Sequence, residues 1–412
     1  MLTDACTLHC LQYGAIPRAV FEAHQALAER SHFNYDTWNG EMIGGGFLES
    51  RTLIAELITA EVDDVVMVEN ASVGMNAAVR SLEPPLKRGD KVIYLSTEYG
   101  MTHSVLNFLE ASAGVVLVQV DMVPTAYHSD DAVMSAVEAA IAEHGGADAF
   151  AMGVISHISS QPAVVLPVAR FCTALPGVPV VVDGAHAPGT IALDVPSLGA
   201  VAYTGNLHKW MYTPKGCGFL WASPEFQGRV QPTVLSSESG GDFSRATAVG
   251  KPFADRRGFT YVGTRDYTNW AAVPAAFEFR RNLPGGEDSC MEYGTALAIW
   301  AGRRLAELWG TEVMAMSERS PSWISMIRVP DFDSLEQAGY VRGRLANKFK
   351  TNSSWTNWGG QTWQRLSAQI YLDRETIEEY GQRVLELRVE HRSLQEEEAV
   401  ADGAQEEDRT RL

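Results

Sequence analysis

The chain has 412 residues, of which 46% are hydrophobic, and it carries a formal net charge of −18. This length favours two domains in one compact subunit, and this hydrophobic content is sufficient to bury their cores. The strong negative charge argues against nucleic acid or an anionic membrane surface as a partner, because binding to phosphates requires clustered Lys and Arg.

Cysteine usage and the two chain ends predict a cytoplasmic protein without a membrane span or a metal. The five cysteines are odd in number and scattered, and no basic segment leads into an apolar run at the N-terminus, which favours a reducing compartment. Cys6, His9 and Cys10 are not followed by a second ligand pair with zinc spacing, so we expect no metal site. Seven acidic residues and two arginines between Glu396 and Leu412 predict a solvated tail.

Apolar runs alternate with helical patterns along the first half of the chain, which is typical of a parallel α/β sheet. Pro17 opens an amphipathic helical run to Ala28, and a second helix is predicted from about Leu48 to Ala60. Glycines 44–46 lack the dinucleotide fingerprint and a preceding strand, so we interpret them as an entry turn. Strands are predicted at 65–68, 91–96, 115–120 and 150–156, and a helix at about 130–143.

Two of these strands are followed by candidate binding residues. The segment Glu69-Asn70-Ala71-Ser72 turns from a strand into a helix, and such a turn of small residues points backbone N–H groups at an anion. The alternative is an ordinary helix start with Ser72 as its N-cap. Tyr99, after the next strand, offers a flat ring for a flat cofactor or is an exposed turn residue.

The stretch 181–218 is the one around which the chain is organised. An apolar strand ends in Asp183, a turn follows through His186, and a second apolar run leads to His208 and Lys209. Pyridoxal 5′-phosphate requires an amine that forms a Schiff base with its aldehyde, and a carboxylate that keeps its ring nitrogen protonated. Lys209 and Asp183 supply these two groups, although many α/β proteins end a strand in Asp with a Lys nearby.

The sequence around Asp183 and Lys209 is more specific than these two residues alone. The segments VVVDGAHAPG (180–189) and YTGNLHKWMYTPKGCGFLW (203–221) resemble the isopenicillin N epimerase-like branch of the class V aminotransferase and cysteine desulfurase superfamily. The resemblance extends over roughly residues 10–385. It implies the α/β architecture of fold type I pyridoxal phosphate enzymes, with a large domain on a mostly parallel seven-stranded sheet and a smaller α+β C-terminal domain.

Domain boundaries follow from this architecture and from a shift to longer helices after Pro274. We expect residues 1–40 to form an arm and a helix that pack with the small domain. Residues 41–273 would form the large cofactor-binding domain, 274–390 the small domain, and 391–412 an acidic, disordered tail. Within the small domain, helices are predicted at 275–281 and about 290–309, and a strand near 323–329.

The resemblance also implies a set of cofactor contacts. Asp183 would contact the ring nitrogen, Lys209 would carry the Schiff base, Tyr99 would stack on the ring, and His186 would lie near the ring or its hydroxyl. His157 is interpreted as a structural histidine. The other implied contacts are from Ala71, Ser72, Asn206 and His208 to the phosphate, and from Ser160 or Gln161 to the ring hydroxyl.

Further segments concern the partner subunit and the substrate. The segment 259–266 resembles the family's Gly-Thr-x-Asp motif, in which Gly263 and Thr264 would reach the partner's cofactor phosphate, and this implies a homodimer with shared sites. Arg365 lies in a segment similar to the family's Arg-x-Ser strand and would bind the α-carboxylate of an amino-acid substrate with two prongs. Tyr13 stands in place of a family segment near the active site and is a candidate substrate contact.

Lys209 would remove the substrate α-proton, and two reactions can follow. If the β-carbon bears a sulfur leaving group, its expulsion leads to pyruvate and ammonia, which is a C–S lyase reaction. If a second acid, for which Tyr99 and Tyr13 are the candidates, delivers a proton to the opposite face, the product is the epimer. The segment 347–364 has no cysteine and Cys290 lies too far upstream, so we reject a persulfide-relaying desulfurase.

Within the branch, the segments 285–287, 291–293 and 365–369 look most similar to ergothioneine-type C–S lyases. The first hypothesis is therefore a pyridoxal phosphate-dependent lyase of an S-substituted L-cysteine or a cysteine sulfoxide, such as hercynylcysteine sulfoxide. An amino-acid epimerase, a cysteine desulfhydrase and a catalytically silent scaffold are the alternatives. Trp355, Trp358 and Trp363 either line an aromatic entrance or belong to the core.

Overall fold

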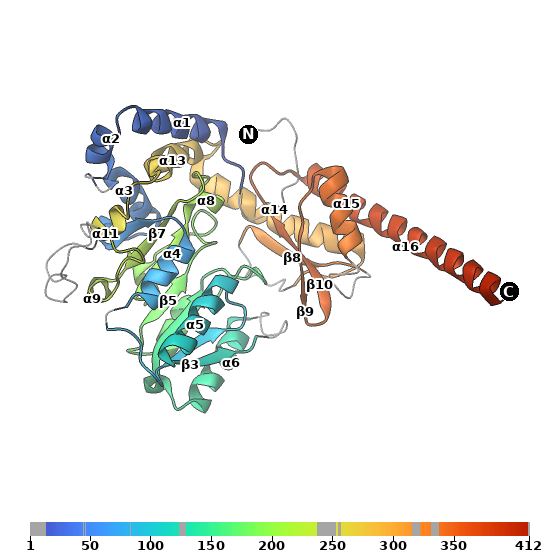
Figure 1. The fold of residues 1–412 in the computed structure, drawn as a ribbon, viewed down its shortest axis with the longest axis horizontal. Coiled ribbons are helices and arrows are strands. Elements are labelled where there is room, and N and C mark those ends of the chain that lie inside the picture. The colour runs from blue at the N-terminus through green and yellow to red at the C-terminus, as the bar shows by residue number, and fades with distance from the viewer. Residues whose placement is uncertain are drawn as a thin grey trace. The chain divides into compact units, whose positions relative to one another are not determined.

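The computed structural model describes residues 14–43, 45, 47–82, 84–122, 129–236, 253, 257–314, 322–330 and 338–410, with backbone alone for Arg257 and for 398–410 (Figure 1). The described residues form two compact units. The first extends to Tyr293, and the second comprises Gly294–Met314 and the chain from Trp323 onward.

The first unit is built on a seven-stranded sheet with the order β1-β7-β6-β5-β4-β2-β3. Strand β7 is antiparallel to both of its neighbours, and all other neighbouring strands are parallel. The strands are β1 (Val65–Val68), β2 (Lys91–Leu95), β3 (Val116–Val120), β4 (Phe150–Ser156), β5 (Val180–Asp183), β6 (Ala202–Asn206) and β7 (Gly218–Ala222). Every residue of β1, β5, β6 and β7 is buried, as expected for strands covered on both faces. The predicted mostly parallel seven-stranded sheet is confirmed.

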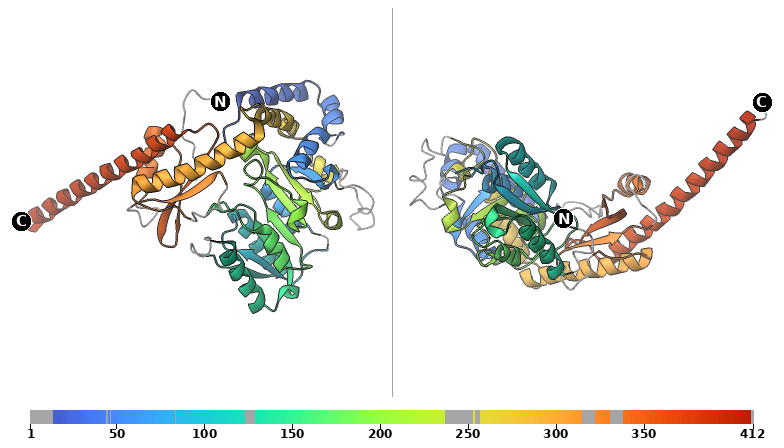
Figure 2. Two further views of the ribbon diagram at one scale, coloured as in Figure 1. Left: turned by 180° about the vertical axis from the view of Figure 1, so that it is seen from behind. Right: turned by 90° about the horizontal axis from the view of Figure 1, so that it is seen from below.

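Helices pack against this sheet. In Figure 1, α4 and α5 lie in front of the strands, and the reverse view in Figure 2 brings the strands toward the viewer. The helices of this unit are α1 (Arg18–Phe33), α2 (Tyr35–Met42), α3 (Leu48–Leu57), α4 (Ala71–Met75), α5 (Gly100–Ala113), α6 (Asp130–Glu143), α7 (Val168–Ala174), α8 (Leu207–Trp210), α9 (Pro224–Gln227), α11 (Arg257–Thr260), α12 (Thr268–Ala271) and α13 (Val273–Arg281). The short α4 continues as one π-helical turn, Asn76–Arg80.

The N-terminal helix packs within the first unit. Helix α1 contacts α2, α12 and α13, and Thr268 Oγ1 lies 2.9 Å from His24 Nε2. The described part of the arm therefore differs from the prediction that it packs with the small domain. The boundary between the two units lies between Tyr293 and Gly294 and not at Pro274, because α13 packs against α1 and α3 of the first unit.

The second unit is a small α+β domain. Its antiparallel sheet has the order β8-β10-β9, and α15 packs against α16. Its elements are β8 (Ile324–Arg328), α15 (Gly339–Phe349), β9 (Ser354–Trp358), β10 (Gln361–Ser367) and α16 (Arg374–Thr410), and α14 (Gly286–Trp309) enters it from the first unit. The backbone of 391–410 continues α16, which differs from the predicted disorder and agrees with the strong helix propensity of Glu, Gln and Ala. In the part of the chain described, no helix is both long and apolar enough to cross a membrane.

Candidate active site

The predicted cofactor residues of the first unit follow the carboxyl ends of neighbouring strands. Strands β2, β4, β5 and β6 are parallel, and β1 points the same way because both β1 and β6 are antiparallel to β7. Their carboxyl ends therefore lie at one edge of the sheet, where α/β proteins bind ligands. Ala71, Tyr99, Asp183 and Lys209 each follow or end one of these strands.

Lys209 lies in α8, the single helical turn that directly follows β6. Its side chain is 7% exposed, and Nζ lies 2.9 Å from His186 Nε2. His186 comes from the turn after β5 and is also buried. His186 was predicted near the cofactor ring, and the structure places it directly against the amine of Lys209.

Asp183 ends β5 and is 4% exposed. Burial raises the pKa of its carboxyl, while the hydrogen bond from the Ala185 N–H (2.9 Å) and the charge of Lys209 act in the opposite direction. The Asp183 carbonyl accepts from the His157 N–H at 2.8 Å, which holds this strand end to β4. A cationic group beside Asp183 would favour its ionised form.

Glu98 is a second buried carboxyl at this edge, and sequence reasoning assigned it no role. It lies between Thr97 and Tyr99 after β2 and is 5% exposed. Its Oε1 accepts from the Ser156 N–H at 2.9 Å, and its Oε2 accepts from the Ser156 hydroxyl at 2.6 Å. Burial raises the pKa of Glu98 to about 8; the Ser156 hydrogen bonds oppose this shift, and the negative charge of Asp183 adds to it.

The turn between β1 and α4 is joined to the end of β6. The Ala71 N–H donates to Asn206 Oδ1 at 2.8 Å, so the NH2 group of Asn206 is the part of this side chain that can donate to an anion. The N-cap of α4 is Asn70, whose side chain accepts from the Val73 N–H at 3.0 Å, and not Ser72. Ser72 lies in the first turn of the helix and is half-buried.

A glycine is required where α4 meets β6. A Cβ atom on Gly74 would lie 2.1 Å from Thr204 Oγ1, far inside van der Waals contact. The close approach brings the start of α4 next to the strand that leads to Lys209. The short turn of small residues therefore has a packing reason as well as the predicted anion-binding one.

His208 and His157 are both neutral at physiological pH. Burial lowers the pKa of His157 to about 4, and its Nδ1 lies 3.0 Å from the Tyr203 hydroxyl, which agrees with a structural role. Burial also lowers the pKa of His208 to about 4, and its Nδ1 lies 2.8 Å from the Cys217 carbonyl. The Cys217 N–H also lies 3.4 Å from the same Nδ1 atom, so His208 is held on both sides by the backbone of Cys217. The contact of His208 with the phosphate stays a prediction.

Three other predicted cofactor residues lie in loops of the first unit. Tyr99 precedes α5 and its side chain is 44% exposed. Ser160 lies in the loop after β4 and is half-buried. Thr264 is exposed with Oγ1 3.2 Å from the Tyr261 hydroxyl, and the next residue, Arg265, forms an ion pair with Glu69 of the turn before α4.

Arg365 lies in the second unit, in the middle of β10, opposite Met326 of β8 and Ser354 of β9. It is 2% exposed. Trp355 and Trp363 are also buried, and Trp363 Nε1 donates to the Trp358 carbonyl at 3.2 Å, which favours the core interpretation of these tryptophans. Tyr13 lies outside the described residues.

The chemistry of the site fits pyridoxal 5′-phosphate. A buried primary amine, a buried carboxylate on the neighbouring strand and a helix start with an adjacent amide are the groups required by its aldehyde, its ring nitrogen and its phosphate. Burial of titratable groups reduces the stability of a fold. A cluster of such groups is therefore typical of a functional site, where their chemistry offsets this cost. Among the described residues, no group of three or more His, Cys, Asp or Glu could hold a metal ion.

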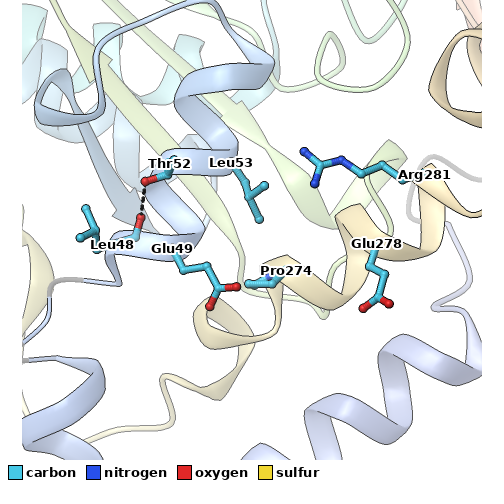
Figure 3. A pocket seen from close by; sticks show the side chains of 7 residues that line it. All are labelled: Leu48, Glu49, Thr52, Leu53, Pro274, Glu278 and Arg281. Atoms are coloured by element: carbon cyan, nitrogen blue, oxygen red, sulfur yellow. Dashed lines mark hydrogen bonds between the residues drawn. The ribbon is translucent and has the colours of Figure 1, made fainter.

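A separate groove lies on the outer helices of the first unit. Its volume is about 790 Å³, and Figure 3 shows it between α3 and α13. It is lined by Leu48, Glu49, Thr52, Leu53, Pro274, Glu278 and Arg281. None of these is a predicted cofactor residue, so the groove is not the cofactor site.

The chain is similar to known proteins in sequence and in fold. The sequence profile described as Aminotransferase class-V matches residues 16–342. An L-cysteine desulfhydrase of Arabidopsis thaliana is 28% identical over 80% of this chain and 74% of its own length, and an isopenicillin N epimerase of Amycolatopsis lactamdurans is 26% identical over 91% of this chain and 93% of its own length. The cystine C–S lyase C-DES, solved with its product cysteine persulfide, shares the fold with a TM-score of 0.77 at 19% identity, covering 93% of this chain and 98% of that one.

Proposed function

Because the chain belongs to the aminotransferase class V family, we propose that it is a carbon–sulfur lyase acting on an S-substituted L-cysteine or a cysteine sulfoxide. Pyridoxal 5′-phosphate is its cofactor. The proposal rests on a buried pair of side chains, Lys209 and His186, whose Nζ and Nε2 atoms lie 2.9 Å apart. Asp183 ends β5, the strand that precedes His186 and lies next to β6. Relatives named as desulfhydrases and epimerases support lyase or epimerase chemistry in general.

When bound, pyridoxal phosphate supplies an electron sink that stabilises negative charge at the substrate Cα. Lys209 Nζ removes the Cα proton, and His186 holds the amine in position and accepts a hydrogen bond from it. The Cβ–S bond breaks with its electron pair on sulfur, and addition of water to the remaining fragment gives pyruvate and ammonia. Asp183 offers its negative charge to the ring nitrogen, and Arg365 binds the substrate carboxylate with two prongs.

Phosphate binding is assigned to the turn at the start of α4. Ala71 and Ser72 would offer backbone N–H groups, and Asn206 would donate from its NH2 group because its Oδ1 already accepts from Ala71. Tyr99 would stack on the ring and Ser160 would contact the ring hydroxyl. Gly263 and Thr264 would serve the site of the partner in a homodimer.

A lyase and an epimerase differ in the acids that they require. An epimerase requires a second acid opposite Lys209. The candidates for this acid are Tyr99, whose side chain is 44% exposed, and Tyr13, which lies outside the described residues. A lyase needs only the base that Lys209 provides.

Pyruvate release from a panel of cysteine derivatives tests this function. The panel contains L-cysteine, S-alkyl cysteines, their sulfoxides and hercynylcysteine sulfoxide. We expect pyruvate from at least one S-substituted member and none from Lys209→Ala. Exchange of the α-proton with deuterated water without pyruvate would favour the epimerase instead, and activity on L-cysteine alone would establish a desulfhydrase.

The proposed setting is a cytoplasmic homodimer. Light scattering of the purified protein tests the dimer. A monomer that retains full activity would contradict shared active sites.

A further inference from the structure

A buried arginine outside the predicted site contacts the two loops that carry Asp183 and Lys209. Arg280, near the end of α13, is completely buried. Its Nη2 donates to the Gly189 carbonyl at 2.9 Å, and its Nη1 donates to the Trp210 carbonyl. Gly189 lies in the turn after Asp183, and Trp210 directly follows Lys209. One guanidinium therefore joins the backbones of both loops.

The charge of Arg280 is balanced by Glu287 in the first turn of α14. Nε donates to Oε2 at 2.7 Å and Nη2 donates to Oε1 at 2.5 Å, so the carboxylate is bound by two prongs. Burial alone would lower the pKa of the guanidinium, but Glu287 outweighs it and the pKa is raised; Cys290 and Tyr212 act in the same direction as Glu287. Two-pronged pairs are specific in direction, so Glu287 fixes where the guanidinium points.

The backbone after α8 adopts a strained conformation against the same helix. Tyr212 has a φ of 62°, in the left-handed region that bulky residues rarely adopt. Its ring lies edge-on to Phe279 of α13, with centroids 6.0 Å apart, and 5.9 Å from the Arg280 guanidinium. A Cβ on Gly189 would lie 2.7 Å from the Met211 sulfur. The two loops are therefore packed tightly together, and side chains of α13 hold them.

We propose that Arg280 and Glu287 are positioning residues that hold the Lys209 amine in place relative to the Asp183 carboxylate. They act through the carbonyls of Gly189 and Trp210. The inference rests on the roles proposed above for Lys209 and Asp183. A displacement of a reacting group by about 1 Å can cost on the order of 100-fold in rate, so loss of the pair affects turnover more than substrate binding.

The neighbouring residue supplies a matched control. Arg281 Nη2 lies 3.3 Å from Glu56 Oε2 of α3, and both side chains are 59% exposed. Figure 3 shows Arg281 extending from α13 toward α3. Exposed pairs of this kind contribute little to stability. Glu56→Gln therefore removes one carboxylate from an arginine of the same helix without affecting either loop.

The experiment compares wild type, Glu287→Gln and Glu56→Gln. Circular dichroism and thermal unfolding establish that each is folded. The first measurement is the rate at which added cofactor attaches to Lys209 in the absence of substrate. The attached cofactor is trapped with borohydride and located by peptide mapping. Steady-state kinetics then separate the effects on kcat and KM. We expect Glu287→Gln to lose roughly 10- to 100-fold in kcat with KM changed by less than about threefold, and to fix the cofactor on Lys209 more slowly. Glu56→Gln should match wild type.

Glu287→Asp is the second variant if Glu287→Gln does not fold. It keeps the negative charge, but its side chain is one methylene shorter, so the carboxylate lies farther from Arg280. We expect the same effects on kcat and on the rate of cofactor attachment, with smaller magnitudes. If the variants melt earlier but fix the cofactor and turn over at wild-type rates, the pair is structural only and the proposal is wrong. If wild type fixes cofactor on Lys209 and releases no pyruvate, the lyase assignment fails while the fixing rates still test the pair. Fixing on another lysine overturns both.

Discussion

The buried carboxyl of Glu98 makes the stability of this protein depend on pH, and Glu98→Gln isolates that dependence. The pKa of Glu98 rises from an ordinary value of 4.5 to about 8 in the folded protein, chiefly because of burial. A raised folded-state pKa means that the associated stability is fully present below pH 4.5 and is lost as pH rises through 8. The full difference corresponds to about 5 kcal/mol, at about 1.4 kcal/mol per pH step.

Glutamine retains the local hydrogen bonds. Its carbonyl oxygen can accept from the Ser156 N–H, and its NH2 group can donate to the Ser156 hydroxyl, which is able to accept. The variant therefore removes the titration and little else. Urea unfolding of the cofactor-free proteins between pH 5 and 9 measures it. We expect the free energy of unfolding of Glu98→Gln, relative to wild type, to increase by about 1.4 kcal/mol per pH step up to pH 8 and then to level off.

Glu143→Gln, at the exposed end of α6, is the control for the loss of a glutamate charge alone. A flat difference for Glu98→Gln would mean that Glu98 ionises as readily in the fold as in the unfolded chain. That outcome would refute the conclusion that burial raises the pKa of Glu98.

Three further substitutions test the site. Gly74→Ala places a Cβ 2.1 Å from Thr204 Oγ1 and should destabilise the protein by about 1–3 kcal/mol, measured by urea unfolding; unchanged stability would mean that α4 shifts freely. Asp183→Asn removes the charge assigned to the ring nitrogen and should lower kcat by about 100-fold in steady-state assays while the protein stays folded; a smaller effect than about threefold contradicts the assignment. Arg365→Lys keeps the charge but not the two-pronged contact, so the KM for the substrate should rise by about tenfold, whereas an unchanged KM would remove Arg365 from the carboxylate site.

The parts of the site that the sequence predicted are those encoded locally. The valine run ending in Asp183 and the small residues around Asn206 identify strand ends directly, because a buried strand of a parallel sheet is apolar throughout. The family resemblance then added the roles of the side chains. The N-cap of α4 was a local choice between two good capping residues, Asn70 and Ser72, and periodicity could not decide it.

The parts that the sequence could not predict depend on strand order and long-range packing. Glu98 meets Ser156 only because β2 lies next to β4, although β3 separates these two strands along the chain. Arg280 meets Trp210 and Gly189 across a large separation in sequence. A helical arginine alone predicts a surface position, and only the fold places this one against the loops that follow Asp183 and Lys209.

Burial acts on the titratable groups of this edge in one direction, toward the neutral form. It raises the pKa of Glu98 to about 8 and lowers those of His157 and His208 to about 4, so these three are predominantly neutral near pH 7. Burial also raises the pKa of Asp183, whereas the hydrogen bond from the Ala185 N–H and the charge of Lys209 oppose that shift. A cationic group held against Asp183, such as the protonated ring nitrogen proposed for it, would add to these opposing effects and favour the carboxylate. The ionised form of Asp183 is therefore the form that a bound cofactor would stabilise most.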